Sequence, residues 1–446
     1  ERMRFMTGKF ITFEGGEGCG KSTQIKLLAA ALEERGYNVL QVREPGGTVV
    51  GERIRDILLA KESTALDSMA ELMLYEAARA QLMAQGIPFT PLTLGEPDFS
   101  TPNYIVEACK QAIDEGKTHY VAENGIPELR AAICEKLARE NNLHYTPDEI
   151  SVTTGVAMAM FISIVATLNP GDEILVPNPV YVTYWQIPQI AQAKIVTYDL
   201  LEENDYQVDV EQIRSRITDK TKMLVVVSPS NPTGGVLRHE SLVEIAALAK
   251  EHDLIVLSDE IYDHFVYDDD LKLESIASLP GMKERCIVLN GFSKSMAMTG
   301  WRLGYIAAPA SFMDAMNRLS FYMTAGTTTF VQHAGVTALQ DEDGSIERMR
   351  TAFKERRDYL VEEIGKMKHF SCKKPEGAFY IFLNIKKTGM SARDFCNFAL
   401  EKVRLAMVPG TAFGLGGEGY VRLSYAYSTE TLHEAVAKLN ELDAMF

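Results

Sequence analysis

The sequence lacks the features that would assign it to several common classes of protein. Its six cysteines are scattered and form no Cys-x-x-Cys pair, so we expect reduced thiols in a cytoplasm, with neither a disulfide framework nor a metal site. No apolar run is long enough to span a membrane, and the first residues are not those expected of a signal peptide. The net charge of −16 argues against nucleic acid or an anionic membrane as a partner.

A linker rich in glycine, serine or proline is also missing, although the pattern of the chain changes near Leu82. The length of 446 residues is sufficient for two or three domains. We therefore predict two unequal parts that are joined directly, residues 1–82 and residues 83–446.

The first part contains a glycine-rich loop between an expected strand and an expected helix. From Gly15 through Gly20 to Ser22, the residues match the pattern Gly-x-x-x-x-Gly-Lys-Ser. Backbone N–H groups of such a loop surround phosphates, while Lys21 neutralises them and Ser22 reaches Mg²⁺. In this context the pattern indicates a nucleotide-binding loop rather than an ordinary glycine turn.

Residues 8–82 resemble the first third of a thymidylate kinase, on this loop, on Arg43 in an Arg-Glu-Pro-Gly-Gly-Thr motif, and on Tyr75 and Arg79. The resemblance implies that the two arginines face a nucleoside monophosphate and that the tyrosine stacks on its base. It stops there, because the family's Asp-Arg-aromatic motif and its arginine-bearing lid segment do not follow. We therefore predict a truncated P-loop module with a vestigial nucleotide site, fused to a different protein.

The second part alternates short apolar runs with helical patterns. Several runs are continuous and rich in β-branched residues, as strands buried on both faces must be. A long charged helix is predicted at Ser345–Lys368, before a C-terminal α+β segment. The runs that we predict to be strands are Ile150–Thr153, Glu173–Val176, Lys194–Tyr198, Met223–Val227, Leu254–Leu257 and Cys286–Leu289.

The most informative motif follows the run Cys286–Leu289. Lys294 lies just past this strand, where a lysine can form an imine with an aldehyde cofactor, and Ser293 and Arg302 can hold the phosphate of that cofactor. Burial lowers the pKa of a lysine toward use as a nucleophile. The residues Gly155–Ala157 begin a helix whose N-terminus can seat a phosphate, although an ordinary strand–helix turn has the same pattern.

Further polar residues follow the ends of the neighbouring strands, where open α/β sheets bind their ligands. Asp259 at a buried strand end is costly unless it meets a cation, such as a protonated pyridine nitrogen. Tyr262 can reach a ring hydroxyl, and Asn231 can donate to a phenolic oxygen. Tyr181 can stack on a flat ring. Alone, Asn231 is compatible with a simple turn and Tyr181 with packing.

Taken together these motifs are specific, and residues 83–446 resemble class I aminotransferases of the aspartate type, from the pyridoxal-phosphate fold type I superfamily. The resemblance also includes Leu94–Phe99, Gly125–Arg130, Gly377–Tyr380 and Val421–Tyr425. It implies an α/β fold with a mostly parallel large-domain sheet, helices on both faces, and a small α+β domain. The implied division assigns residues 103–350 to the large, cofactor-binding domain, and residues 83–102 with 351–446 to the small domain.

The resemblance also implies pyridoxal 5′-phosphate as the cofactor and a role for each site residue. Arg422 clamps the α-carboxylate of the substrate, helped by Asn231 and the Gly95 backbone. Tyr120 reaches the phosphate in the neighbouring subunit, which implies a homodimer with active sites at the subunit interface. The cofactor contacts that it implies are Lys294 for the imine, Asp259 for the pyridine nitrogen, Tyr262 and Asn231 for the ring oxygen, Tyr181 for stacking, and Ser293, Arg302 and the backbone of Gly155, Val156 and Ala157 for the phosphate.

The sequence departs from this family pattern at two places. Gly291 stands where relatives often carry a serine that can donate to the phosphate. The N-terminal arm that packs on the partner subunit in this family is replaced by the kinase-like residues.

The predicted function is transamination between an L-amino acid and a 2-oxo acid, with aspartate and 2-oxoglutarate as the pair that the resemblance implies. Lys294 acts as the general base for the α-proton, and Asp259 keeps the ring nitrogen protonated. Two alternative activities stay open from the sequence, beside a non-enzymatic reading in which residues 1–82 are only a structural replacement for the missing arm. One is a pyridoxal-phosphate lyase on the same site, and the other is a dTMP kinase acting through Lys21 and Ser22.

Overall fold

The computed structural model describes residues 28–29, 31–36, 53–54, 57, 89–268, 270–340 and 343–446. The chain divides into two compact units, residues 1–88 and residues 89–446. The second unit is described almost completely and contains every element discussed below. The residues predicted to bind a nucleotide lie outside the described residues; these are Gly15, Gly20, Lys21, Ser22, Arg43, Tyr75 and Arg79.

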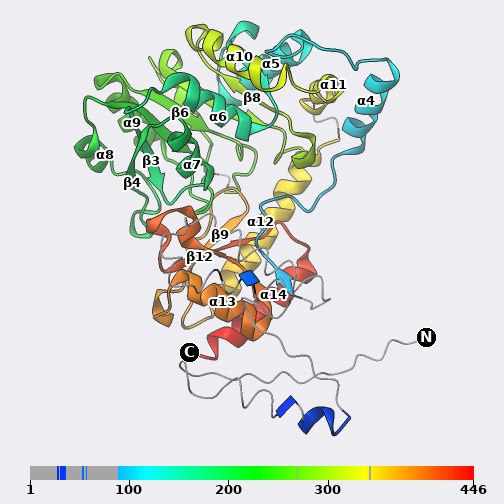
Figure 1. Ribbon diagram of the computed structural model, residues 1–446, viewed down its shortest axis with the longest axis vertical. Coiled ribbons are helices and arrows are strands. Elements are labelled where there is room, and N and C mark those ends of the chain that lie inside the picture. The colour runs from blue at the N-terminus through cyan, green and yellow to red at the C-terminus, as the bar shows by residue number, and fades with distance from the viewer. Residues whose placement is uncertain are drawn as a thin grey trace. The chain divides into compact units, whose positions relative to one another are not determined.

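A seven-stranded sheet forms the framework of the second unit (Figure 1). The strands lie in the order β2-β8-β7-β6-β5-β3-β4, and all neighbours are parallel except that β8 is antiparallel to both β2 and β7. The strands are β2 (Ile150–Thr153), β3 (Glu173–Asn178), β4 (Lys194–Asp199), β5 (Thr221–Val227), β6 (Ile255–Asp259), β7 (Cys286–Gly291) and β8 (Gly304–Ala307).

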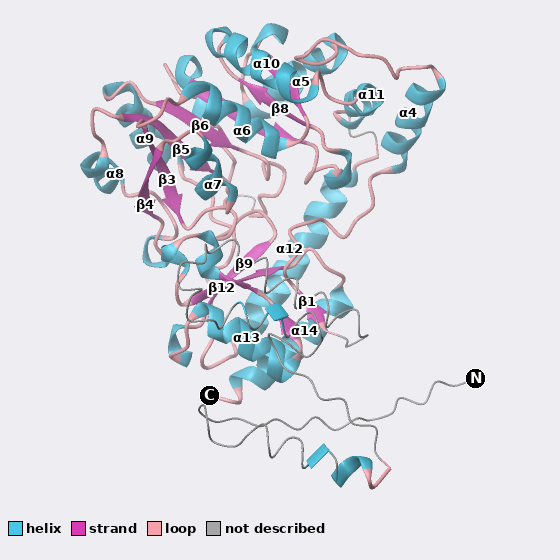
Figure 2. Ribbon diagram, in the orientation of Figure 1, coloured by secondary structure: helices cyan, strands magenta, loops and turns pink. Residues whose placement is uncertain are grey.

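Both faces of this sheet are buried, because apolar side chains alternate between two hydrophobic clusters. On β5, Met223, Val225 and Val227 join one cluster, whereas Leu224 and Val226 join the other. Helices therefore cover both faces, as Figure 2 shows for the strands of the upper part. The α-helices are α4 (Asn103–Asp114), α5 (Pro127–Asn141), α6 (Val156–Thr167), α7 (Thr183–Ile190), α8 (Val210–Arg216), α9 (His239–Glu251), α10 (Ala310–Thr324), α11 (Thr329–Ala338), α12 (Ser345–Ile364), α13 (Ala392–Val403) and α14 (Thr429–Asp443).

The long helix α12 runs from the part that holds the large sheet into a smaller α+β part (Figure 1). There α13 and α14 pack beside an antiparallel sheet of order β11-β12-β9. A short parallel pair, β1 with β10, lies in the same part. The strands are β1 (Thr90–Pro91), β9 (Tyr380–Asn384), β10 (Leu405–Ala406), β11 (Val408–Pro409) and β12 (Tyr420–Ser424).

Short 3-10 helices connect these elements. Those that bear on the site and its surroundings are η3 (Glu202–Asn204), η6 (Thr299–Trp301) and η8 (Gly410–Phe413). The remaining ones are η2 (Pro147–Glu149), η4 (Ile276–Ser278), η5 (Lys283–Arg285), η7 (Lys386–Thr388) and η9 (Leu415–Gly417).

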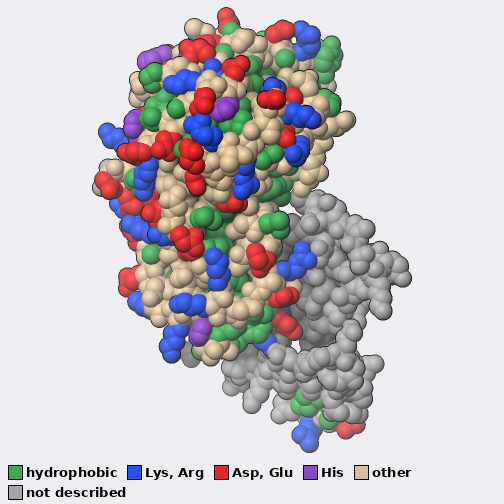
Figure 3. All heavy atoms as spheres, turned by 90° about the vertical axis from the view of Figure 1, so that its left-hand side faces the viewer, with side chains coloured by type: hydrophobic (Ala, Val, Ile, Leu, Met, Phe, Trp, Pro, Cys, Tyr) green, Lys and Arg blue, Asp and Glu red, His purple; other side chains and the backbone are tan. Residues whose placement is uncertain are grey.

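The predicted α/β fold class is confirmed, and each of the six apolar runs predicted to be a strand overlaps one strand of the large sheet. The predicted helix Ser345–Lys368 is shorter in the structure, because α12 ends at Ile364 before Gly365. None of the helices in the described part of the chain is both long and apolar enough to cross a membrane. On the face drawn in Figure 3, acidic and basic side chains are interspersed over the described part.

Candidate active site

The carboxyl ends of three adjacent parallel strands bring the central residues of the site together. Strand β6 ends at Asp259, which lies opposite Val227 of β5 and Leu289 of β7. Asn231 follows β5 by four residues, and Lys294 follows β7 by three. The common edge of the sheet therefore explains why residues far apart in the sequence meet, as expected for open α/β sheets.

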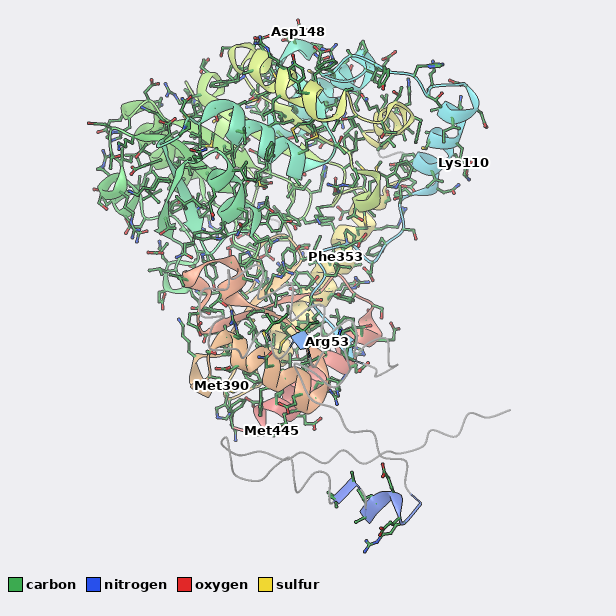
Figure 4. The ribbon with its side chains drawn as sticks, in the orientation of Figure 1. Arg53, Lys110, Asp148, Phe353, Met390 and Met445 are labelled. Carbon is green, nitrogen blue, oxygen red and sulfur yellow. The ribbon has the colours of Figure 1, made fainter. Side chains whose placement is uncertain are left out.

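Lys294 lies on this edge against two aromatic rings. Its Nζ donates a hydrogen bond to the Gly95 carbonyl oxygen at 2.6 Å. The same Nζ lies 5.9 Å from the ring centre of Tyr262 and 5.7 Å from that of Phe379. Phe379 packs in turn on Phe353, which Figure 4 labels on α12. The amine is thus held in a defined position between the loop before α4 and an aromatic cluster.

The pKa of Lys294 is lowered to about 8, and burial is the main cause. The positive charges of Arg422 and Arg302 lower the pKa further, whereas the negative charges of Glu96 and Asp259 oppose the shift. About a tenth of this amine is therefore uncharged at pH 7, far more than for an exposed lysine, and the uncharged form is the one that attacks an aldehyde or accepts a proton.

Asp259 is a buried carboxylate with two hydrogen-bond donors. The Tyr184 hydroxyl donates to Oδ2 at 2.9 Å, and the Ile261 N–H donates to Oδ1 at 3.3 Å. Burial raises the pKa of Asp259 to about 6, although both donors and the Lys294 charge act in the opposite direction. A carboxylate that is kept buried at this cost is suited to a cation such as a protonated ring nitrogen.

Tyr262 and Tyr380 form a pair of hydroxyl groups beside Lys294. Their hydroxyl oxygens are 2.8 Å apart, and the two rings meet edge to face at 5.9 Å. Tyr380 also lies against Gly95, where an added Cβ would overlap the tyrosine hydroxyl. Glycine at position 95 thus allows its backbone to approach the site closely.

Arg422 on β12 is buried, with 6 % of its surface exposed, although it carries a charge. Its Nη1 donates to Asn231 Oδ1 at 3.1 Å, and its Nη2 donates to the Thr93 carbonyl oxygen at 2.6 Å. The guanidinium lies over the rings of Tyr380, at 4.5 Å, and Phe413, at 4.8 Å. Its Nε is buried without a hydrogen-bond partner, so the fork has donor capacity left for an anion.

The start of α6 and the guanidinium of Arg302 form an anion-binding corner. Gly155 is the N-cap residue of α6 and has a φ of 80°, and a Cβ there would overlap Nη2 of Arg302. The first N–H groups of a helix have no acceptor within the helix, and its dipole favours negative charge. Ser293 is buried in the turn after β7, which also carries Lys294. This corner can therefore hold a phosphate.

Gly291 is where the family pattern often has a serine, and the structure explains the glycine. Gly291 pairs with Gly304 across β7 and β8. A Cβ on Gly291 would lie 2.9 Å from Gly304 Cα and 2.9 Å from Val156 Cγ2. Val156 thus occupies the space that a serine side chain would need, and the start of α6 packs directly on the ends of both strands.

Two predicted aromatic residues have more open surroundings. Tyr181, just after β3, is 37 % exposed and is close enough to Tyr262 and Tyr380 to affect the pKa of each through its charge. Tyr120 is 88 % exposed. It is one of the residues, 118–121 and 325–330, that line a groove of about 410 Å³. That groove includes none of the other predicted site residues.

Sequence reasoning assigned no role to three residues that contact the site. Tyr184 holds Asp259, Tyr380 holds Tyr262, and Phe413 covers Arg422. Tyr184 follows Tyr181 by one helical turn, which is a signal that could have been used. Tyr380 ends the motif Gly377–Tyr380, which the resemblance already includes, whereas no local signal in the sequence marks Phe413.

The arrangement fits a cofactor that combines a phosphate, a pyridine ring and an aldehyde. The anion-binding corner at Gly155 and Arg302 suits the phosphate. The buried carboxylate of Asp259 suits a protonated ring nitrogen, and the amine of Lys294 suits the aldehyde. Such a site defines an enzyme that uses pyridoxal phosphate.

Comparison with known proteins agrees with this class. The sequence model of the family "Aminotransferase class I and II" matches residues 87–439. The aspartate aminotransferase of Pyrococcus abyssi is 46 % identical over 354 residues, 79 % of this chain and 90 % of the relative. The aromatic-amino-acid aminotransferase 2 of Thermococcus litoralis is 42 % identical and covers 81 % of this chain and 93 % of its own length. The chain belongs to the class I and II aminotransferase family, whose members depend on pyridoxal phosphate.

Solved structures show the same fold. The aspartate aminotransferase of Thermus thermophilus with maleate superimposes with a TM-score of 0.80 at 37 % identity, over 86 % of this chain and 99 % of that one. The aromatic aminotransferase of Pyrococcus horikoshii gives a TM-score of 0.79 at 42 % identity, over 82 % and 98 %. At the other end, the thymidylate kinase family model matches residues 13–89. Both resemblances stated from the sequence are thus confirmed.

Proposed function

We propose that this aminotransferase moves the amino group of L-aspartate to 2-oxoglutarate. The observation that carries the proposal is the meeting of an amine, a buried carboxylate and a buried guanidinium, from Lys294, Asp259 and Arg422, around one pair of tyrosines. The choice of aspartate rests on the names of the relatives from Pyrococcus abyssi and Thermus thermophilus.

Pyridoxal phosphate, when bound, supplies an aldehyde and a ring that accepts electrons. In our proposal Asp259 accepts a hydrogen bond from the ring nitrogen and keeps it protonated. Arg302, Ser293 and the backbone of Gly155–Ala157 hold the phosphate. The helix N-terminus and the guanidinium that lie side by side there support this assignment.

The ring itself is oriented by three polar or aromatic side chains. Tyr262 and Asn231 contact the ring oxygen, and Tyr181 stacks on the ring. The hydrogen bonds that hold Tyr262 to Tyr380 and Asn231 to Arg422 support these roles, because they restrict both side chains before the cofactor arrives.

Lys294 is proposed to hold the cofactor and then to move the proton. With pyridoxal phosphate bound, Nζ of Lys294 would hold its aldehyde carbon and, once free of it, would be the base that takes the α-proton of the substrate and delivers it to C4′. The lowered pKa of Lys294, about 8, supports this use as a base near neutral pH. Arg422 clamps the α-carboxylate of the substrate, helped by Asn231 and the Gly95 backbone.

We also propose a homodimer in which Tyr120 reaches the phosphate bound by the neighbouring subunit. The exposure of this tyrosine supports the proposal, as does the nearby exposed pair Phe321 and Tyr322, which are 50 % and 79 % exposed near the end of α10. None of the five cysteines in the described part of the chain forms a disulfide, which suits a reducing compartment such as the cytoplasm.

The domain division is part of the same proposal. Residues 103–350 form the large, cofactor-binding domain, and residues 83–102 with 351–446 form the small domain. Residues 1–82 stand where the family has its N-terminal arm, and their nucleotide site is vestigial. The boundary at residue 351 lies within helix α12 (Ser345–Ile364), which leads into the small part.

A spectrum of the purified protein with added pyridoxal phosphate, followed by a panel of amino donors with 2-oxoglutarate, tests the proposal. We expect L-aspartate to give oxaloacetate and glutamate, and Lys294→Ala to abolish turnover. Ammonia and pyruvate as products would indicate a lyase instead. Phosphate transfer from ATP to dTMP, lost in Lys21→Ala, would show that the kinase site is active.

A further inference from the structure

A buried ion pair lies beside the site and takes no part in the chemistry described above. Nζ of Lys136, on α5, forms an ion pair with Oδ2 of Asp263, in the turn after β6. Each of the two side chains is only 5 % exposed. Taking two charges out of water is costly, and an ion pair repays this cost only when further hydrogen bonds satisfy it.

The carboxylate of Asp263 also connects the two strand ends that carry the catalytic groups. Its Oδ2 accepts a second hydrogen bond from Asn290 Nδ2 at 2.8 Å, and Asn290 Oδ1 accepts one from the Gly291 N–H at 2.7 Å. Asp263 follows Tyr262 directly, and Asn290 precedes Lys294 by four residues on β7. Oδ2 of Asp263 therefore connects the turn that carries Tyr262 to strand β7, which leads into the turn with Lys294.

The pair is ionised at neutral pH. Burial acts to raise the pKa of Asp263, but the nearby charges of Lys136 and His264, with the bonds from Lys136 and Asn290, lower it to about 2. Asp263 and Glu140 hold the pKa of Lys136 above its ordinary value. Protonation changes in the working range of an enzyme thus leave the link intact.

Only a few main-chain hydrogen bonds hold the turn that follows β6. The Glu260 N–H donates to the Leu289 carbonyl at 2.9 Å, and the Asp263 N–H donates to the Glu260 carbonyl at 3.0 Å. Beyond Glu260, the link from Asp263 to Asn290 is the side-chain contact that ties the turn to β7. The position of Tyr262 relative to Lys294 therefore depends on this link together with the hydrogen bond between Tyr262 and Tyr380.

We propose that Lys136, Asp263 and Asn290 form a positioning bridge that sets the distance between Tyr262 and Lys294, and so the grip on the cofactor ring. The proposal rests on the proposed function, because it takes Tyr262 as a donor to the ring oxygen. None of the three residues touches the cofactor. Each acts through the strand ends that it holds.

The variant Asn290→Ser tests the bridge, because it breaks the contact with Asp263 and leaves the ion pair in place. We expect a folded protein whose dissociation constant for pyridoxal phosphate rises about tenfold. The pH at which the bound cofactor changes its absorption should rise by about one unit, since one charge-assisted hydrogen bond to the ring oxygen is weakened. A wild-type dissociation constant and a wild-type midpoint would overturn the proposal.

Asn384→Ser on β9 is the matched control, because Asn384 Nδ2 also donates to a carboxylate, that of Glu202, at 2.6 Å. Its cofactor affinity should stay within about twofold of wild type.

A second variant separates positioning from stability. Replacing both charges, in Lys136→Met with Asp263→Leu, removes the ion pair and the bridge but leaves no buried charge uncompensated. We expect a folded protein whose thermal stability falls only by the cost of the Asn290 amide that loses its acceptor, together with the same loss of cofactor affinity as in Asn290→Ser. Wild-type affinity in this double variant would reduce the pair to a structural role. If the wild-type protein itself neither bound pyridoxal phosphate nor transferred amino groups, the proposed function would fail instead.

Discussion

The clamp assigned to Arg422 is tested by Arg422→Lys, which keeps the charge and removes the planar fork. The guanidinium is buried between two rings and bonds Asn231 Oδ1 and the Thr93 carbonyl, with its Nε left without a partner. A lysine ammonium in this space can reach a substrate carboxylate at one point but cannot also satisfy both protein acceptors.

The size of the effect follows from what the lysine leaves unmade. One charge-assisted hydrogen bond to the substrate contributes about 1.5 to 3 kcal/mol, and an acceptor left unsatisfied in the interior costs about 1 to 3 kcal/mol. Together these amount to about 2.5 to 6 kcal/mol, or a decrease of about 10² to 10⁴-fold in kcat/KM for L-aspartate. The cofactor dissociation constant should change much less than kcat/KM, because Arg422 is assigned to the substrate and reaches the cofactor only indirectly, through its hydrogen bond to Asn231 and its charge near Lys294.

Steady-state kinetics with L-aspartate and 2-oxoglutarate, alongside a cofactor titration, measure both quantities. The control is Arg130→Lys on α5, a mostly buried arginine whose Nη1 donates to the Pro147 carbonyl at 2.8 Å. It makes the same chemical change outside the site and should alter kcat/KM by no more than about twofold. If Arg422→Lys kept kcat/KM within this range, or lost cofactor affinity in parallel with activity, the assignment of the fork to the α-carboxylate would be refuted.

Two further predictions use the electrostatics of the site, and a third uses the linkage between cofactor binding and stability. Asp259→Asn should abolish most turnover, yet at pH 8 it should raise the unfolding free energy of the cofactor-free protein by about 2 to 3 kcal/mol. The reason is that the pKa of Asp259 is raised to about 6 in the folded protein, so the protonated form that favours folding is lost as the pH rises through this value. A less stable variant would contradict this. Recombination of the cofactor-free protein with pyridoxal phosphate should accelerate with pH and level off near pH 8, where Lys294 loses its proton; a rise continuing to about pH 10, as for an exposed lysine, would contradict it. Removing the cofactor should lower the melting temperature. The loss corresponds to about 2.7 kcal/mol of unfolding free energy, relative to protein in the presence of free cofactor at 100 times its dissociation constant. Scanning calorimetry at several cofactor concentrations measures this shift.

The large sheet could be predicted from the sequence to a considerable extent. Strands such as β5 and β7 are buried on both faces, so they require continuous apolar runs that stand out from the helical patterns around them. Strand β8 was missed, because Gly304–Ala307 is short and begins with a glycine. That glycine is needed for contact with the start of α6, and nothing in the local sequence shows this contact.

Most of the candidate site could also be predicted, for a reason that lies in the fold class. The carboxyl ends of neighbouring parallel strands must share one edge, so polar residues that follow buried strands are candidates for a common site. Lys294, Asp259 and Asn231 were found in this way, and the structure brings them to that edge.

The supporting contacts could not be predicted. Tyr184 bonds Asp259 across 75 residues, Tyr380 bonds Tyr262 across 118, and Lys136 meets Asp263 across 127. A local pattern reports which side chains a strand or helix turns inward, and this was enough for the type of sheet and for the groups at its edge. Which distant side chain then reaches each group depends on how helices and loops pack over that edge, so Tyr184, Tyr380 and Lys136 acquired a place near the chemistry only in the folded chain.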